Sequence, residues 1–375
     1  MLNRSRLLKA LEQKEEQLFP DYRHEYDIAR QIWHQICEDP QFAYKVEKVV
    51  APWPVPSWVG DLSAVYPVVP QASQYQAISV DGSQIYPDRH QYASCFLINV
   101  GSVSIEYKQG QKSTVTFDSQ PFVFSSKEFQ KEGEFSRDFV NGQRQYLEML
   151  GGLEKTVSLE EKERHNTILF FDGSLIFWHL ESKTNNLLER FLPEYLSLLQ
   201  QFYEHKIMTV GYISMPRSRE LVNLIRLQLC DFKVKNQEPW TLVEGVVDAA
   251  IAGFYVELYH RTTVFKNNAA ITASYPQEVI PYFFYINVGD EIARVEIPAW
   301  IALDQTLTDY VASVVLDQAI KGRGYPVVLA EAHEQAVVKG PDRDFFYHLL
   351  DKIGIEQNRT SVSSKKSMHK RIMRI

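Results

Sequence analysis

The chain has 375 residues, of which 45% are hydrophobic and 23% are charged, and its formal net charge is −7. This composition is typical of a folded globular protein and excludes a collagen-like or wholly disordered chain. The length allows one large domain or two, and the mild acidity gives no advance support for a protein that coats nucleic acid, since such proteins are usually basic.

Neither a membrane span nor a disulfide framework is indicated by the sequence. The longest apolar stretch, residues 167–180, contains Asp-Gly-Ser and is shorter than the roughly 18 residues that a span requires. The N-terminus leads into a charged helical pattern without the apolar core of a signal peptide. The three cysteines are far apart, which suits a reducing compartment. We therefore expect a soluble, cytoplasmic protein that does not enter a membrane.

The first part of the chain is predicted to be helical. Apolar residues recur at helical spacing over residues 3–18 and 21–38, with a break near Pro20. Prolines are then frequent over residues 51–73, which makes regular structure unfavourable there. The sequence therefore predicts a helical extension with a Pro-rich connector over residues 1–73, a main body over residues 74–355 and a basic tail over residues 356–375.

The main body is predicted to contain strands first and strand–helix units later. We expect strands at residues 75–80, 92–100, 103–108 and 113–117, with turns at Gly101 and Gly110. There follow a helix (137–153), a strand (167–171), a helix (183–205), a strand (207–213) and a helix (218–229). The last third is predicted to form strands (283–288, 293–297), a helix (304–319), a strand (325–329) and helices near Glu334 and over residues 342–353. This order predicts a mixed α/β layer structure.

Two segments share one pattern, in which an apolar strand ends in Asp-Gly-Ser. Asp81 follows the apolar residues of the first strand, and Asp172 follows those of a middle strand. Either segment could be an ordinary Asp-Gly turn, because glycine permits a sharp bend. If the two strands are neighbours, however, both carboxylates meet at one edge of the sheet and repel each other unless a cation lies between them. Hard oxygen ligands suit Mg²⁺ or Mn²⁺.

A histidine near the end of the main body is a further candidate. The apolar run Val327–Ala330 predicts a strand, and His333 follows just beyond its end. A lone histidine is more often structural than catalytic. Next to carboxylates gathered at strand ends, it becomes a candidate metal ligand or proton-transfer group.

The order of these motifs resembles the NurA nuclease domain, over about Val80 to Asp342. The resemblance rests on the early Asp-Gly-Ser, the later Asp-Gly-Ser-Leu, and a late tyrosine, Tyr325, eight residues before His333. It implies an RNase H-like mixed sheet flanked by helices, with residues 74–355 as the nuclease domain. It also implies a homodimer that cleaves DNA with Mn²⁺, with Mg²⁺ as the alternative ion, as a 5′-to-3′ exonuclease and single-strand endonuclease. The implied partner is a HerA-type hexameric DNA translocase, in end resection during double-strand break repair.

The resemblance also assigns roles to individual residues. Asp81 and Asp172 match the two metal-binding aspartates, and Tyr325 and His333 match the late tyrosine and histidine. The family has a further glutamate on the helix before the second aspartate. The spacing of Arg144-Gln-Tyr-Leu-Glu148 fits this position, so Glu148 is the first choice. The other candidates are Glu154 and, more weakly, Glu106 and Glu331.

Basic residues that could contact DNA occur in two places. Many relatives have a lysine after the strand at 207–213, where this chain has Arg217 and Arg219, and either arginine could hold a phosphate instead. The C-terminal tail has no acidic residue after Glu356. It is either a solvated end or an arm that contacts phosphates. Its candidate residues are Lys365, Lys366, Lys370 and Arg371.

These residues predict a metal-assisted hydrolysis of phosphodiesters. One or two ions held by Asp81, Glu148 and Asp172 could activate water and stabilise the leaving oxygen. His333 would complete the metal shell or transfer a proton, and Tyr325 would orient a phosphate oxygen or a water, or belong to the core.

Two other functions remain open from the sequence alone. One is a non-catalytic adaptor that docks on the translocase at DNA ends, although such a degenerate copy would usually have lost a site residue. The other is an actin-like or sugar-kinase-like ATPase, which would require glycine-rich phosphate loops that neither Asp-Gly-Ser segment provides.

Overall fold

The computed structural model describes residues 2–71, 74–87, 95–125, 136–181, 185–235 and 238–356. Within these residues the centre of the protein is an 11-stranded sheet. Its strands are β1 (Ser57–Trp58), β2 (Val65–Pro67), β3 (Tyr75–Ile85), β4 (Cys95–Tyr107), β5 (Thr114–Ser125), β6 (Thr167–Asp172), β7 (Met208–Ile213), β8 (His260–Thr262), β9 (Phe265–Lys266), β10 (Pro281–Asn287) and β11 (Ile292–Pro298).

The sheet is mixed, with its parallel part at the centre. The main strand order is β1-β9-β10-β11-β7-β6-β3-β4-β5, and β2 and β8 pair beside β10. β6 is parallel to both β3 and β7, whereas the remaining pairs are antiparallel. β6 has apolar residues on both faces, since Ile168, Leu169 and Phe170 are all fully buried. A continuous apolar run is typical of a central parallel strand that is covered on both sides.

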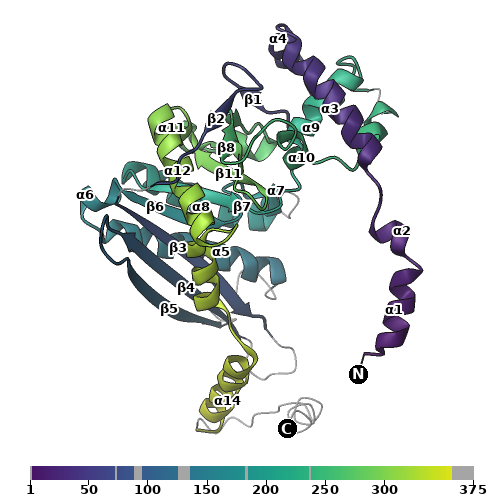
Figure 1. Ribbon diagram of the computed structural model, residues 1–375. Coiled ribbons are helices and arrows are strands. Elements are labelled where there is room, and N and C mark those ends of the chain that lie inside the picture. Colours follow the sequence, from purple (N-terminus) through teal and green to yellow (C-terminus); the bar gives the residue numbers. More distant parts are fainter. Residues whose placement is uncertain are drawn as a thin grey trace.

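Helices cover both faces of the sheet (Figure 1). In chain order they are α1 (Arg4–Glu12), α2 (Glu15–Leu18), α3 (Arg23–Glu38), α4 (Phe42–Glu47), α5 (Arg137–Val157), α6 (Glu161–Arg164), α7 (Trp178–Glu181), α8 (Asn185–Glu204), α9 (Glu220–Leu229), α10 (Asp248–Ala252), α11 (Ala299–Ala302), α12 (Gln305–Lys321), α13 (Val327–Ala336) and α14 (Gly340–Glu356). Three 3₁₀ turns, η1 (Glu238–Val243), η2 (Ala270–Ser274) and η3 (Gln277–Val279), complete the described elements. The α/β fold class predicted from the sequence is therefore confirmed.

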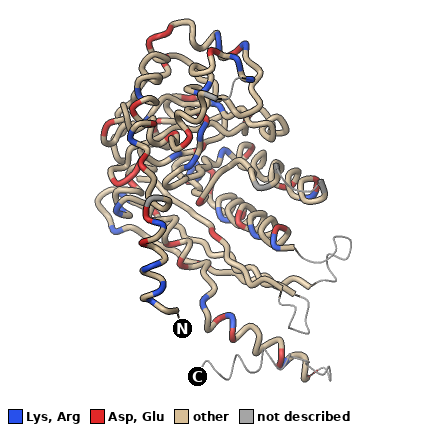
Figure 2. Tube along the Cα trace, turned by 90° about the vertical axis from the view of Figure 1, so that its right-hand side faces the viewer, with Lys and Arg blue, Asp and Glu red and all other residues tan. Residues whose placement is uncertain are grey.

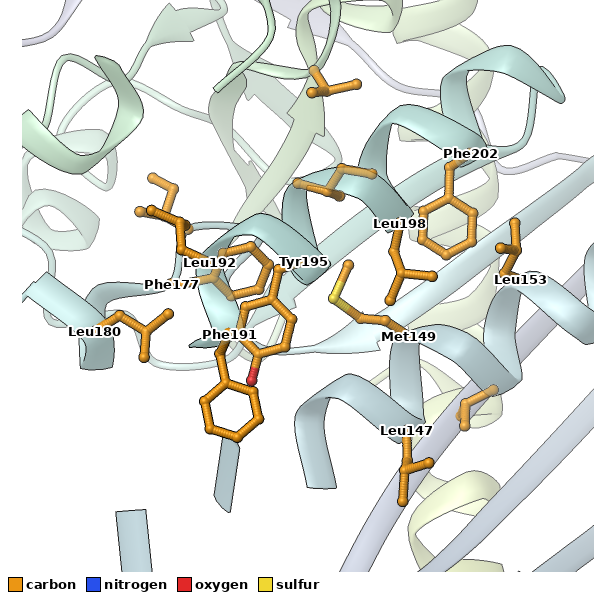
Figure 3. Packing of buried hydrophobic residues seen from close by; sticks show 14 of the residues in the cluster. Leu147, Met149, Leu153, Phe177, Leu180, Phe191, Leu192, Tyr195, Leu198 and Phe202 are labelled. Atoms are coloured by element: carbon orange, nitrogen blue, oxygen red, sulfur yellow. The ribbon is translucent and has the colours of Figure 1, made fainter. Parts of the chain in front are cut away.

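The alternation of side chains along β3 divides the core into two layers. Ile78 and Val80 point to the side of α5 and α8, and Ala77 points to the side of α12 and α13. The first layer is rich in large side chains, as Figure 3 shows for α5, α7 and α8. There the rings of Phe177 and Tyr195 lie 4.2 Å apart between centroids. α5 is thereby held firmly over the strands that carry the two aspartates.

The N-terminal helices differ in how closely they contact the rest of the protein. α1 and α2 project away from the sheet (Figure 1) and α1 has no buried residue. α3 instead packs on α9 and α10 through Ala29, Trp33 and Ile36. β1 and β2 lie within the Pro-rich connector and pair with β9 and β8. The division of the chain at residue 73 stays a prediction.

Three local predictions from the sequence are wrong. The first Asp-Gly-Ser does not end its strand, because β3 continues to Ile85 and pairs with β4 along its whole length. Gly101 lies inside β4 rather than at a turn. A Cβ there would collide with the backbone of Ala336, so glycine is required by close packing of α13. Finally, the strand predicted at residues 325–329 is wrong, because α13 already begins at Val327 and runs to Ala336, through the helix predicted near Glu334.

The sequence at the start of α13 does not by itself distinguish a buried strand from a buried helix. Four consecutive apolar residues are compatible with a short buried strand or with a buried helix. Here Val328, Leu329, Ala332 and Ala336 are buried, which places them on one side of a helix that packs on β3 and β4. None of the helices in the described part of the chain is both long and apolar enough to span a membrane.

Candidate active site

The two aspartates lie beside each other on neighbouring parallel strands. Ser79 of β3 pairs with Phe170 of β6, so the same register two residues further on brings Asp81 next to Asp172. Asp81 lies within β3, whereas Asp172 is the last residue of β6. Their mutual repulsion is one of the causes that raise the pKa of Asp172, after burial by the surrounding atoms. The Asp172 side chain is nevertheless reached by solvent.

Glu148 reaches these aspartates from α5. Gly82 makes this approach possible, because a Cβ at that position would lie 2.6 Å from the Glu148 Oε1 atom. Burial raises the pKa of Glu148 to about 8; Arg144 opposes this shift, while Asp81 and Asp172 add to it. The side chain of Glu148 is only 13% exposed. The structure therefore places a third carboxyl group at the site, in an environment that disfavours its charge.

Arg144 supplies a positive charge among these acidic groups. Its guanidinium forms an ion pair with Glu148, one turn further along α5. Nη1 donates a hydrogen bond to the Gly82 carbonyl oxygen at 3.2 Å and lies 4.0 Å from Asp81 Oδ1. Arg144 therefore partly neutralises the cluster from the helix side.

His333 contacts Asp81 from α13, which packs on β3 and β4. Its Nδ1 donates to Asp81 Oδ2 at 2.8 Å, and the imidazole is 62% exposed. Ser83, the serine of the first Asp-Gly-Ser, fixes α13 in this position. Its hydroxyl donates to the Ala336 carbonyl oxygen at 2.6 Å and accepts from the Val338 amide at 2.9 Å. The serine thus positions the histidine rather than capping a turn.

Tyr325 lies just before α13 and contacts Asp172. Its hydroxyl group is close enough to the Asp172 carboxyl group to oppose the rise in the pKa of that carboxyl group. Burial raises the pKa of the Tyr325 phenol well above its usual value. The ring packs edge-on against Tyr212, with 5.5 Å between ring centroids. Tyr325 therefore combines a packing contact with a polar contact to the site.

The turn after β6, which follows Asp172, is held by a buried ion pair that the sequence analysis missed. Gly173 has a φ of +128°, which requires glycine. Glu296 accepts hydrogen bonds from the Ser174 hydroxyl at 2.7 Å and the Leu175 amide at 2.8 Å. Arg294 Nε donates to the same carboxylate at 2.9 Å. Two opposite charges at alternate positions of an apolar strand, in Ile292–Pro298, were the available signal.

The other candidates fall into three groups. Glu154 is exposed near the end of α5, and Glu106 forms an ion pair with Lys108 on β4. Neither these residues nor Glu331 lines the cavity of about 150 Å³ that contains Asp81, Glu148 and Asp172. Arg217 and Arg219 follow β7 and line a larger adjoining cavity of about 460 Å³. The basic tail residues Lys365, Lys366, Lys370 and Arg371 lie outside the described residues.

The site contains side chains of the types that bind metal ions, but they are not arranged as a metal-binding cluster. Among the described residues, no group of three or more His, Cys, Asp or Glu side chains is arranged closely enough to hold a metal ion. The donors that converge, three carboxyl groups and one imidazole, are nevertheless those that Mg²⁺ and Mn²⁺ prefer or accept. Burial first, and repulsion from Asp81 after it, raise the pKa values of Glu148 and Asp172, and a bound cation would stabilise the charged form of both groups.

The fold is α/β, and acidic side chains from the central strands β3 and β6 and from α5 gather at one small cavity. The NurA domain model matches residues 75–338, and the chain belongs to this family. The structure is similar to the crystal structure of the NurA nuclease from Sulfolobus solfataricus, with a TM-score of 0.52 and 15% sequence identity over 95% of this chain and 98% of that one. No curated protein sequence matches the chain. Family membership supports a nuclease-type function.

Proposed function

We propose that this protein is a divalent-metal-dependent deoxyribonuclease that uses Mn²⁺ or Mg²⁺. The observation that carries the proposal is the convergence of acidic side chains from β3, β6 and α5 on one small cavity, with the imidazole of His333 in contact with Asp81. Carboxylates that repel each other in this way are favourable ligands for a divalent cation. The ligands would be Asp81, Glu148, Asp172 and His333.

Each residue has a part in the proposed hydrolysis. A bound divalent ion would make a water more acidic and stabilise the leaving oxygen. Asp81 and Asp172 would provide negative charge on neighbouring strands, and the Tyr325 hydroxyl lies beside the Asp172 carboxyl group and could orient it. His333 is exposed and bonded to Asp81, so it can hold or transfer a proton at its ring nitrogens. Arg144 pairs with Glu148 and lies 4.0 Å from Asp81, so it would balance negative charge at the site.

Digestion of labelled DNA with Mn²⁺, Mg²⁺ or EDTA tests this proposal. Cleavage should require a divalent ion, and Asp81→Asn or Asp172→Asn should abolish it while the protein stays folded. Asp118→Asn is the matched control, because Asp118 is an exposed aspartate on β5 that pairs with Lys155 away from the site. Retained metal-dependent cleavage in both site variants would contradict the assignment. Products of end-labelled substrates would show whether the enzyme acts as a 5′-to-3′ exonuclease and single-strand endonuclease.

The proposed setting is DNA end resection in double-strand break repair, in the cytoplasm, as a homodimer with a HerA-type hexameric translocase. The charge distribution supports a need for such a partner. The net charge is −7, and basic and acidic residues are intermingled along the described chain in Figure 2. Long-range attraction to DNA should therefore be weak. A translocase that delivers the strand would raise activity on long duplexes far more than on short single strands.

The adaptor alternative is less well supported. A degenerate subunit would be expected to lack part of the acidic cluster, whereas here Asp81, Glu148, Asp172 and His333 are all present and lie together. The digestion assay separates the two functions, because an adaptor would bind DNA ends or the translocase without metal-dependent cleavage.

A further inference from the structure

The larger cavity beside the acidic cluster has no part in the mechanism proposed above. It measures about 460 Å³, and its walls include Pro54, Trp178, Ile213 and Pro216 together with Arg217 and Arg219. It shares Gly173 and Ser174 with the cavity that contains the three carboxyl groups. A ligand that spans both cavities would therefore cross the turn that directly follows Asp172.

The charge of this cavity favours an anion. Glu220 and Glu296 also line it, but both are buried and both pair with Arg294, each at 2.9 Å. Arg294 therefore balances one of these two negative charges, and with Arg217 and Arg219 the lining has three arginines against two glutamates. In the part of the chain that the structure describes, Arg217 and Arg219 form no ion pair with a carboxylate. Arg219 is also close enough to Arg226 to lower the pKa of that guanidinium, after the larger effect of burial.

The walls of the cavity are held in place by hydrogen bonds between distant segments. Asn223 of α9 donates from Nδ2 to the Pro54 carbonyl oxygen at 2.7 Å, which fixes the Pro-rich connector over the cavity. The Ser218 carbonyl oxygen accepts from the Asp248 amide at 2.9 Å. A pocket that is formed in advance costs less ordering when a ligand binds.

We propose that this cavity binds one nucleotide of the DNA strand, with its base against Trp178 and a phosphate at Arg217 and Arg219. The inference rests on the proposed function, because the next phosphodiester along the strand would lie at the acidic cluster. Trp178 and the two arginines line the same cavity, and aromatic side chains combined with basic groups are what proteins use to hold single-stranded nucleic acid without reading its sequence. The pocket thus accounts for how an acidic protein keeps a strand in register with its catalytic groups.

Equilibrium binding of fluorescent single-stranded oligonucleotides in EDTA at low ionic strength tests this proposal without requiring catalysis. A series of oligonucleotides carries one abasic nucleotide at successive positions. For the wild-type protein, one position should weaken binding by about 5- to 100-fold, the usual range for loss of one stacked base. Trp178→Ala should bind the intact oligonucleotide more weakly than the wild type does, by the same factor. An abasic nucleotide at the sensitive position should then weaken binding by Trp178→Ala no further.

Two variants control for a change in folding. Arg217 is exposed, so Arg217→Ala should keep the fold, weaken binding of every oligonucleotide and preserve the abasic effect. Trp300→Ala removes a tryptophan whose ring lies near Tyr203 and should preserve the abasic effect as well. The proposal would be overturned if the wild type bound all the abasic oligonucleotides with equal affinity. It would also be overturned if the abasic nucleotide weakened binding by Trp178→Ala as much as binding by the wild type. If that happens while Asp81→Asn still abolishes cleavage, the nucleotide pocket is wrong and the nuclease assignment stands.

Discussion

Replacement of Glu148 by glutamine should change how the stability of the metal-free protein depends on pH. The pKa of Glu148 is about 8 in the folded protein, against 4.5 for an unperturbed glutamate. The folded state therefore holds a proton that the unfolded state releases. The resulting stability is complete below about pH 4.5 and is lost as pH rises towards 8. The full shift corresponds to a ceiling of about 5 kcal/mol in the free energy of unfolding.

Urea unfolding in EDTA between pH 5 and 9 measures this effect. The wild type should lose about 2 to 4 kcal/mol more than Glu148→Gln over that range, because glutamine cannot ionise. Glu154→Gln is the matched control, since Glu154 is exposed on the same helix and its replacement should leave the wild-type slope unchanged. Equal slopes for wild type and Glu148→Gln would refute the reasoning.

Three further predictions concern other parts of the site. Glu296→Gln should destabilise the protein by about 1.5 to 3 kcal/mol in urea unfolding, because Arg294, the Ser174 hydroxyl and the Leu175 amide lose a charged acceptor while Arg294 keeps Glu220; a loss below about 0.5 kcal/mol would argue against this role. His333→Ala should leave stability within about 0.5 kcal/mol, since the side chain is 62% exposed, yet lower kcat about 100-fold or more; unchanged kcat would exclude proton transfer or metal binding by this residue. Removal of residues 362–375 should weaken DNA binding and flatten its salt dependence, and identical salt slopes would show that the tail contacts no phosphate.

The part of the site that could be predicted from the sequence depends on short-range pattern. Asp81 and Asp172 each follow an apolar strand, and the structure brings them together because the two strands are parallel neighbours in matching register. The spacing of Arg144 and Glu148 is helical, so both point to the same side of α5 and form an ion pair. For these residues the local pattern of the sequence is sufficient to predict that they belong to the site.

The part that could not be predicted depends on contacts between distant segments. Gly82-Ser83 has the composition of a turn, but pairing with β4 keeps it extended. The packing of α13 on β3 and β4 selects helix for an apolar run that could equally have been a strand. Glu296 acts on the turn after β6 through hydrogen bonds across more than a hundred residues, and no local motif indicates such a contact.

Calorimetric titration of the protein with Mn²⁺ tests the central claim most directly. If Asp81, Glu148 and Asp172 share a cation, Mn²⁺ should bind to the wild type and displace the proton that Glu148 holds at pH 7. Titrations in buffers of different ionisation enthalpy should therefore report release of about one proton per ion in the wild type and much less in Glu148→Gln. Binding should be lost in Asp81→Asn and Asp172→Asn. Absence of Mn²⁺ binding to the wild type, or equal binding by all these variants, would contradict the account.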